Sequence, residues 1–123
     1  MANRVLIVDD EPNIVTSLEF LMGRSGYETR VARDGDEALA AVEAFRPDLV
    51  LLDVMLPRRD GFEVCQHLRA NGWTDLKIVM LTAKGREAEI AKGMAVGADS
   101  YVTKPFSTRD LVEAVTRLLE GDS

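Results

Sequence analysis

The sequence predicts an α/β fold in which a parallel sheet is covered by helices on both faces. Short apolar runs alternate with longer amphipathic runs, five of each, which is typical of parallel strands joined by right-handed helical crossovers. One strand-like run, Leu49–Leu52, is apolar at every position and suits a strand buried on both faces. The length of 123 residues fits one compact domain, so we expect a (βα)5 unit, a doubly wound five-stranded parallel sheet, over residues 1–123.

The first half of the chain opens with Arg4–Val8, a branched apolar run typical of a buried strand. Apolar residues then recur at helical spacing over Ile14–Met22, and Gly26 suits the left-handed position that ends such a helix. A weaker strand is expected at Tyr27–Val31. The helix after this strand must end before Pro47, because proline cannot continue a helix.

The second half continues the same alternation, and turn-forming residues bound each helix. Glycines follow the two middle helices, at Gly72 and Gly97, and Ser107 and Asp110 are spaced as a capping pair at the start of the last one. The expected strands are Asp48–Asp53, Lys77–Leu81 and Ser100–Val102, and the expected helices are Phe62–Ala70, Glu87–Ala95 and one that buries Leu111, Val115 and Leu118.

The composition excludes several classes of function. A net charge of −6 without any basic run argues against nucleic-acid binding, which needs clustered Lys and Arg. The apolar runs are too short to cross a bilayer, and the first residues do not resemble a signal peptide. The single Cys65 cannot form an internal disulfide, which suits a reducing compartment. We therefore expect a cytoplasmic domain that binds neither nucleic acid nor membranes directly.

Polar side chains follow four of the five expected strands at the point where each strand ends. They are Asp9 and Asp10 after the first strand, Asp53 at the end of the third, Thr82 after the fourth and Lys104 after the fifth. Carboxyl ends of parallel strands meet at one edge of the sheet, where ligands bind in open sheets of this kind. The sequence therefore predicts a polar site built from these residues.

Three neighbouring carboxylates repel one another, and a hard divalent ion such as Mg²⁺, which prefers oxygen ligands, relieves the repulsion. Lys104 would add a second positive charge. A carboxylate between two cations suits nucleophilic attack on phosphorus, and Thr82 could hydrogen-bond a phosphoryl oxygen.

Each residue alone also has a simpler interpretation. Asp9 and Asp10 could cap a helix, Asp53 could belong to a turn, Thr82 could cap the next helix, and Lys104 could be a solvated surface charge. Taken together, these interpretations require all four strand ends to be polar by coincidence.

The residues resemble the receiver domain of bacterial two-component response regulators, with a chemotaxis-regulator-like fold, over essentially the whole chain. Each matching motif is weak alone, but their order and spacing are specific. The motifs are Val8-Asp9-Asp10-Glu11, Leu52-Asp53-Val54-Met55-Leu56-Pro57, Asp60-Gly61, Leu81-Thr82-Ala83, Gly97-Ala98-Asp99 and Lys104-Pro105-Phe106. The resemblance implies the strand order 2-1-3-4-5.

The resemblance implies that Asp53 accepts a phosphoryl group from a phosphohistidine on a sensor histidine kinase or a histidine phosphotransfer protein. It further implies that Asp10, Asp53 and the backbone carbonyl of Met55 ligate Mg²⁺, while Asp9 assists through water. The domain would be a signalling switch that catalyses its own aspartyl phosphorylation and dephosphorylation, and not an enzyme in the ordinary sense.

The remaining motif residues receive switching roles by the same resemblance. The Thr82 hydroxyl moves to the phosphoryl group, Tyr101 turns inward to fill the vacated space, and Lys104 pairs with the phosphoryl group. The bond between Lys104 and Pro105 is expected to be cis. The output face would be formed by the helix Glu87–Ala95, the following strand and the last helix.

The downstream partner is not identified by the sequence. The motifs are closest to the subfamily with winged-helix DNA-binding domains, whose receivers dimerise through the output face. Ile90 and Ala114 are uncharged where that subfamily places basic partners for ion pairs across the dimer. A phosphorylation-dependent homodimer through an apolar contact of Ala91, Met94 and Val112 stays open.

Other functions on a similar fold are less consistent with the residues. Aspartate-nucleophile phosphatases carry an Asp-x-Asp motif after the first strand, whereas Asp9 and Asp10 of this chain are adjacent. A nucleotide-binding protein would need a glycine-rich phosphate loop after the first strand, whereas Asp10-Glu11-Pro12 at this position is acidic and contains no glycine. The main alternative is a non-phosphorylated protein-interaction module on the same fold.

Overall fold

Five strands and five helices alternate along the chain in the computed structural model, which describes residues 3–83 and 86–121. The strands are β1 (Arg4–Val8), β2 (Glu28–Ala32), β3 (Leu49–Asp53), β4 (Lys77–Ala83) and β5 (Ser100–Lys104). The helices are α1 (Pro12–Arg24), α2 (Gly35–Phe45), α3 (Gly61–Ala70), α4 (Glu87–Ala95) and α5 (Thr108–Glu120).

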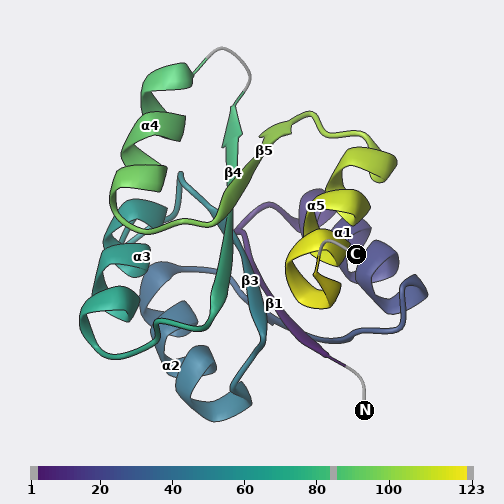
Figure 1. The fold of residues 1–123 in the computed structure, drawn as a ribbon, viewed down its shortest axis with the longest axis horizontal. Helices are drawn as coiled ribbons and strands as arrows, with labels where there is room; N and C mark the ends of the chain where they lie inside the picture. The colour runs from purple at the N-terminus through teal and green to yellow at the C-terminus, as the bar shows by residue number, and fades with distance from the viewer. Residues whose placement is uncertain (1–2, 84–85, 122–123) are drawn as a thin grey trace.

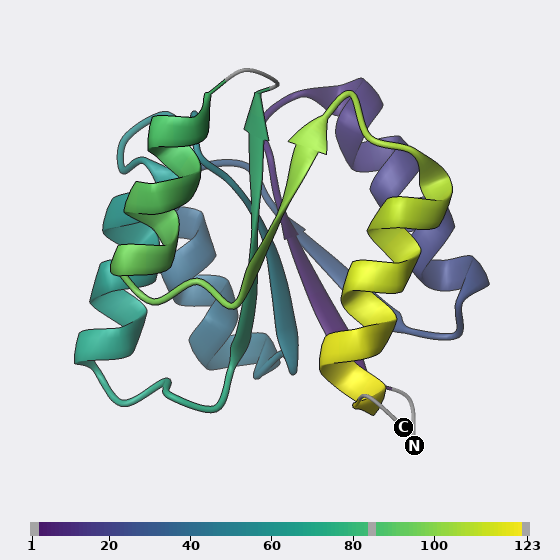
Figure 2. The ribbon, with the colours of Figure 1, turned by 45° about the horizontal axis from the view of Figure 1, so that its top comes forward.

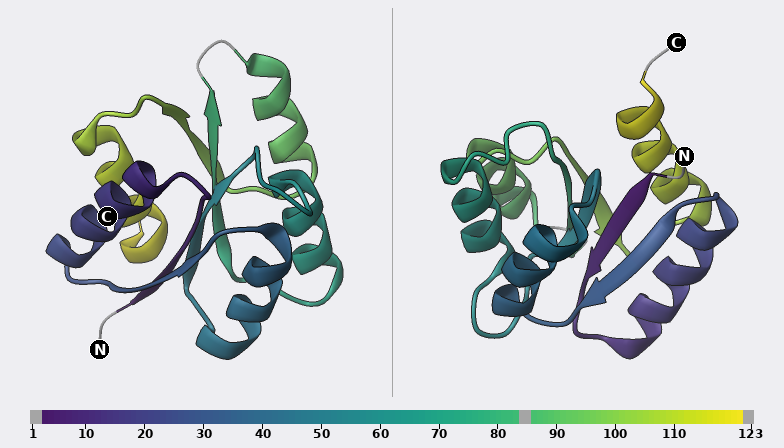
Figure 3. Two further views of the ribbon diagram at one scale, coloured as in Figure 1. Left: turned by 180° about the vertical axis from the view of Figure 1, so that it is seen from behind. Right: turned by 90° about the horizontal axis from the view of Figure 1, so that it is seen from below.

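All strand pairs are parallel, and the sheet has the order β2-β1-β3-β4-β5 (Figure 1). Helices α1 and α5 cover one face of the sheet, and α2, α3 and α4 cover the other (Figure 2). The view from below shows β2 at the edge of the sheet beside β1 (Figure 3). The predicted doubly wound (βα)5 fold is confirmed. No helix in residues 3–83 and 86–121 has the length and hydropathy that crossing a membrane requires.

The structure corrects five strand boundaries. The second strand ends one residue later than predicted, at Ala32, which pairs with Val8, and the third begins one residue later, at Leu49. The second strand begins one residue later than predicted, because the backbone N–H of Tyr27 bonds the carbonyl of Met22 and so belongs to the end of α1. The fourth and fifth strands continue two residues further than predicted, since Thr82 pairs with Thr103 and Ala83 with Lys104. These two strands carry Thr82 and Lys104 to the carboxyl edge of the sheet.

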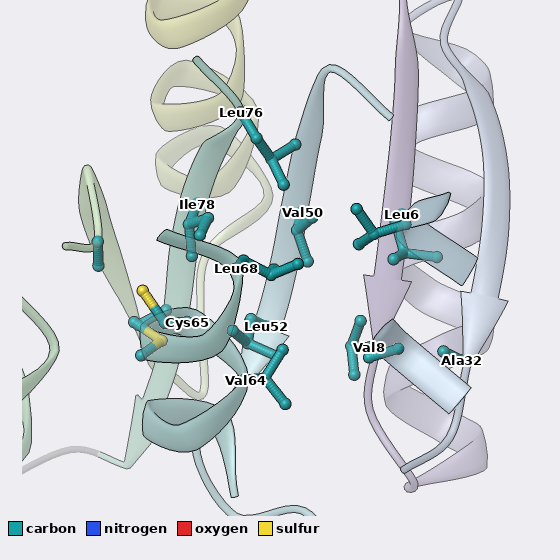
Figure 4. Close-up of a cluster of buried hydrophobic side chains, with 14 of the residues drawn as sticks. Leu6, Val8, Ala32, Val50, Leu52, Val64, Cys65, Leu68, Leu76 and Ile78 are labelled. Atoms are coloured by element: carbon teal, nitrogen blue, oxygen red, sulfur yellow. The ribbon is translucent and has the colours of Figure 1, made fainter. Parts of the chain in front are cut away.

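Two apolar clusters hold the layers together, one on each face of the sheet. Along β1, Leu6 and Val8 face the cluster under α2 and α3, whereas Val5 and Ile7 face the cluster under α1 and α5. Figure 4 shows the first cluster, in which Cys65 packs as an ordinary buried side chain. Each fully buried Val, Leu or Ile side chain of these clusters stabilises the fold by about 1.5–3 kcal/mol. The strands that carry the polar residues are therefore held firmly in place.

Helix α4 is attached to the sheet differently from the other helices. Its one fully buried residue is Gly93, whereas each of the other four helices buries at least two larger side chains. A Cβ atom at Gly93 would lie 3.2 Å from Cγ of Met80, so the missing side chain lets α4 approach β4 closely. Helix α4 therefore has little apolar anchorage of its own.

Arg69 of α3 connects the segments on either side of α4. Its Nη1 atom donates to the carbonyls of Trp73 and Leu76, both at 2.6 Å, and its Nε atom donates to the carbonyl of Gly97 at 3.0 Å. Its Nη2 atom is 2.9 Å from Oδ2 of Asp99. One guanidinium thus joins the turn before β4 to the turn before β5.

Arg69→Ala is expected to lower the free energy of unfolding by about 2–4 kcal/mol, because three carbonyls and a carboxylate lose a charged partner. The measurement is urea denaturation followed by circular dichroism. Arg109→Ala is the matched control, since it removes only the exposed pair with Glu113 and is expected to change stability by less than about 0.5 kcal/mol. Equal losses in the two variants would contradict the role given to Arg69.

Candidate functional site

The carboxylates of Asp9, Asp10 and Asp53 meet at the carboxyl edge of the sheet. Each offers an oxygen atom, and these three atoms lie within 4.8 Å of one another. Asp9 follows β1 and is fully buried, Asp53 ends the neighbouring β3 and is 6% exposed, and Asp10 is exposed. The parallel order of β1 and β3 therefore brings together the three acids that the sequence placed at strand ends.

Lys104 bridges the two buried acids from the end of β5. Its Nζ atom is 2.8 Å from Oδ2 of Asp9 and 3.4 Å from Oδ1 of Asp53. The peptide bond between Lys104 and Pro105 is cis. The direct pair with Asp9 was not anticipated from the sequence, because it depends on how far β5 extends.

The hydrogen bonds of the two buried acids differ. Oδ1 of Asp9 accepts the backbone N–H of Glu11 at 2.9 Å, and Oδ2 accepts from Lys104, so both oxygens are engaged. Oδ1 of Asp53 accepts the backbone N–H of Met55 at 3.2 Å. In the described part of the chain, no donor bonds Oδ2 of Asp53. Asp53 therefore keeps one oxygen available, whereas Asp9 does not.

The pKa of Asp53 is raised from 3.8 to about 6, because burial and then the negative charge of Asp9 outweigh the opposing effects of Lys104 and of the Met55 N–H. Burial alone would lower the pKa of Lys104, but its bonds and charge interactions with Asp9 and Asp53 outweigh burial and raise it. Lys104 is therefore a firmly protonated ammonium, and Asp53 is a carboxylate that is costly to ionise without a cation.

The residues of this site fit a divalent cation with oxygen ligands. Three carboxylates and one ammonium leave two negative charges uncompensated, and Mg²⁺ is held typically by one or two carboxylates and retained waters. Asp10 is exposed and gives access from solvent. Among residues 3–83 and 86–121, no donor bonds the carbonyl oxygen of Met55, which leaves it free to serve as a ligand.

Thr82 borders the cluster, and Tyr101 does not. Thr82 is 1% exposed and lies one residue beyond Leu81, the residue of β4 that pairs with Asp53. Among the residues that the structure describes, its hydroxyl donates one hydrogen bond, a long one of 3.4 Å to the carbonyl of Ala83. Tyr101 is 45% exposed and lines a groove of about 420 Å³ between β5 and α5. None of the three clustered carboxylates lines that groove.

The raised pKa of Asp53 predicts a dependence of stability on pH in the metal-free domain. Below pH 3.8 the carboxyl is protonated in both states, and between pH 3.8 and about 6 only the unfolded chain ionises, so stability falls as pH rises through this range. Asp53→Asn removes this loss and is expected to be about 1–2 kcal/mol more stable than the wild type at pH 7, with no gain near pH 4.

Urea denaturation in the presence of a chelator at both pH values measures the difference. Asp75→Asn, which changes an exposed acid at the opposite edge of the sheet, is the control and should leave stability unchanged. A destabilised Asp53→Asn variant at pH 7 would mean that the ion pair between Lys104 and Asp53 stabilises the fold by more than burial of the ionised carboxylate destabilises it.

Comparison with known proteins identifies the family. Residues 5–116 match the family model of the response regulator receiver domain. The chain is 48% identical over 119 residues to the alkaline phosphatase synthesis transcriptional regulatory protein PhoP of Bacillus subtilis, a match that covers 97% of this chain and 49% of that protein. The chain thus spans about half the length of this curated relative.

Solved structures agree with this match. A putative response regulator from Chloroflexus aurantiacus has a TM-score of 0.93 and 37% identity, covering 98% of this chain and 99% of its own. The chemotaxis response regulator CheY4 of Vibrio cholerae has a TM-score of 0.90 and 33% identity, covering 97% of this chain and all (100%) of its own. The chain therefore belongs to the response regulator receiver domains, the family whose function is phosphorylation-based two-component signalling.

Proposed function

We propose that this domain accepts a phosphoryl group on Asp53 from a phosphohistidine of a sensor histidine kinase or histidine phosphotransfer protein, in a Mg²⁺-dependent reaction. The observation that carries the proposal is the position of Asp53. Its carboxylate is buried between Lys104 and the acids of a site that fits a divalent cation, and it retains an oxygen without a hydrogen-bond partner in the described residues.

Asp53 is a better acceptor than its neighbours for reasons of geometry. Both oxygens of Asp9 are engaged and its side chain is fully buried. Asp10 is exposed to water, and the ion pairs of Lys104 in the described residues are with Asp9 and Asp53. Attack by Oδ2 of Asp53 forms the new oxygen–phosphorus bond as the nitrogen–phosphorus bond of the donor breaks, and the imidazole leaves with the bonding electron pair. Lys104 neutralises charge on the transferring group.

Asp10, Asp53 and the Met55 carbonyl would hold the metal, with Asp9 assisting through water. When bound, Mg²⁺ supplies positive charge to the phosphoryl oxygens and removes the cost of ionising Asp53. The same groups would favour hydrolysis of the acyl phosphate, so the domain would catalyse both the gain and the loss of its phosphoryl group.

We infer that Thr82 and Tyr101 carry the change to the output face. A phosphoryl group adds nearly two negative charges and strong acceptors beside Thr82, whose hydroxyl has only a long bond to give up. Its movement would vacate space beneath β5, and the exposed Tyr101 would turn inward. Helix α4, with its single buried glycine, is the element that can respond at least cost.

The output is proposed to use the face formed by α4, β5 and α5. Ala91, Met94 and Val112 give this face an apolar surface, and Asp99 is already engaged by Arg69 within the same chain. A homodimer through this face would therefore depend on apolar contact more than on ion pairs. A downstream partner would read the same face in the cytoplasm, the compartment that the sequence predicts.

Incubation with acetyl phosphate and Mg²⁺ is expected to add one phosphoryl group on Asp53, detected by mass spectrometry of the intact and digested protein. Asp53→Asn and a chelator should each abolish the addition, and Asp75→Asn should leave it unchanged. Addition to the Asp53→Asn variant, or none to the wild type, would instead favour a protein-interaction module that is not phosphorylated.

Beryllofluoride with Mg²⁺ is expected to shift the domain from monomer to dimer in sedimentation velocity, because the mimic favours the active output face. Met94→Asp should remain monomeric, since it places a charge in the apolar contact. The dimer should persist at high salt, because screening weakens exposed ion pairs and leaves apolar contacts intact. An unchanged mass of the wild type with beryllofluoride would count against activation by dimerisation.

A further inference from the structure

We propose that the start of α2 positions the phosphorylation site, with Gly35 and the ion pair between Asp36 and Arg59 holding the loop that follows Asp53. This loop, residues 54–60, carries the Met55 carbonyl that would ligate the metal. The inference rests on the proposed function of Asp53 and adds positioning residues that do not touch the reacting atoms.

Gly35 is required by space and not by its backbone conformation. A Cβ atom at this position would lie 2.4 Å from Cβ of Arg59 and 2.5 Å from its carbonyl oxygen, far inside van der Waals contact. Gly35 is the first residue of α2 and is not among the residues with positive φ, so its backbone would accept alanine without strain. Its backbone N–H donates to the carbonyl of Pro57 at 3.3 Å, on the same loop.

Opposite charges join the same two segments. Nε of Arg59 is 2.8 Å from Oδ1 of Asp36, and Nε of Arg58 is 3.7 Å from Oδ2 of Asp34. Asp34 also caps α2, because its side chain accepts the backbone N–H of Glu37 at 2.7 Å. The acids thus come from the helix start and the arginines from the loop, so the loop is held by polar contacts as well as by close packing.

The two ends of the loop meet beside Asp53. The backbone N–H of Met55 bonds Oδ1 of Asp53, and the N–H of Gly61 bonds the carbonyl of Val54 at 2.9 Å. A Cβ atom at Gly61 would lie 2.4 Å from the carbonyl oxygen of Asp53, so the segment that follows the loop packs closely on the residue that precedes it. The loop is thus held at its two ends and again at residues 57–59. We therefore expect a displacement at Arg59 to move Met55, which is only four residues away.

Gly35→Ala is the sharpest probe of this arrangement. Its Cβ atom would have to gain about 1 Å of separation from Arg59, and a misplacement of that size in a catalytic site costs up to about 100-fold in rate. We expect the dissociation constant for Mg²⁺, measured by isothermal titration calorimetry, to rise about 10-fold, and the rate of phosphorylation by acetyl phosphate to fall by a similar factor.

Gly23→Ala is the matched control, because Gly23 lies within α1 and a Cβ atom there meets nothing within 4 Å. Hydrogen exchange supplies a readout that needs neither metal nor phosphoryl group. In the metal-free protein, the amides of residues 54–61 should exchange faster in Gly35→Ala than in Gly23→Ala. Equal exchange and equal Mg²⁺ affinity in the two variants would overturn the inference, even if Asp53 of the wild type is phosphorylated as proposed.

A charge exchange tests the ion pair separately and remains informative if Gly35→Ala does not fold. Asp36→Arg and Arg59→Asp should each weaken Mg²⁺ binding, and the double variant, which has the wild-type net charge, should recover most of the loss. An exposed pair of this kind is worth up to about 1 kcal/mol, so each single variant should change the dissociation constant by up to about fivefold. Strictly additive effects in the double variant would mean that only the overall charge matters.

Discussion

The constraint on which the rest of this domain depends is the burial of two carboxylates side by side. Asp9 and Asp53 lie on neighbouring strands in a water-poor edge of the sheet, and Lys104 arrives from the far strand to bridge them. Burial and the charge of Asp9 outweigh the single ammonium and raise the pKa of Asp53 to about 6. The cluster of three acids therefore favours a further positive charge. The apolar clusters on both faces keep these strands fixed and so prevent the acids from moving apart.

Most of the fold followed from local patterns in the sequence. The continuous apolar run in β3 and the amphipathic runs between strands predicted the parallel sheet, because burial on both faces leaves no polar position within a strand. The ends of β4 and β5 were missed, since Thr82 and Lys104 are polar and signal the end of a run although their backbones continue to pair. Strand length at the functional edge is set by the neighbouring strand, which local pattern does not record.

The sequence predicted which residues form the site but not which of them contact one another. Strand-end positions identified Asp9, Asp53 and Lys104, yet the bond between Lys104 and Asp9 joins residues 95 positions apart and depends on the completed sheet. The contact of Gly35 with Arg59 was likewise beyond the sequence, because a glycine beside an N-terminal cap looks like an ordinary turn residue. The three-dimensional structure shows that Arg59, in the loop after β3, occupies the space where a side chain at position 35 would lie.

The buried glycine of α4, Gly93, has a consequence for the free energy that phosphorylation must supply to switch this domain. Converting a population from 1% to 99% active requires a differential interaction of about 5.5 kcal/mol. A helix that buried several leucines would add the loss of their contacts to this requirement. The one buried residue of α4 is Gly93, which faces Met80 and Phe62. The two conformations can then differ little in buried apolar area. The free energy that phosphorylation must supply to shift the equilibrium is therefore within the range of a few charged hydrogen bonds.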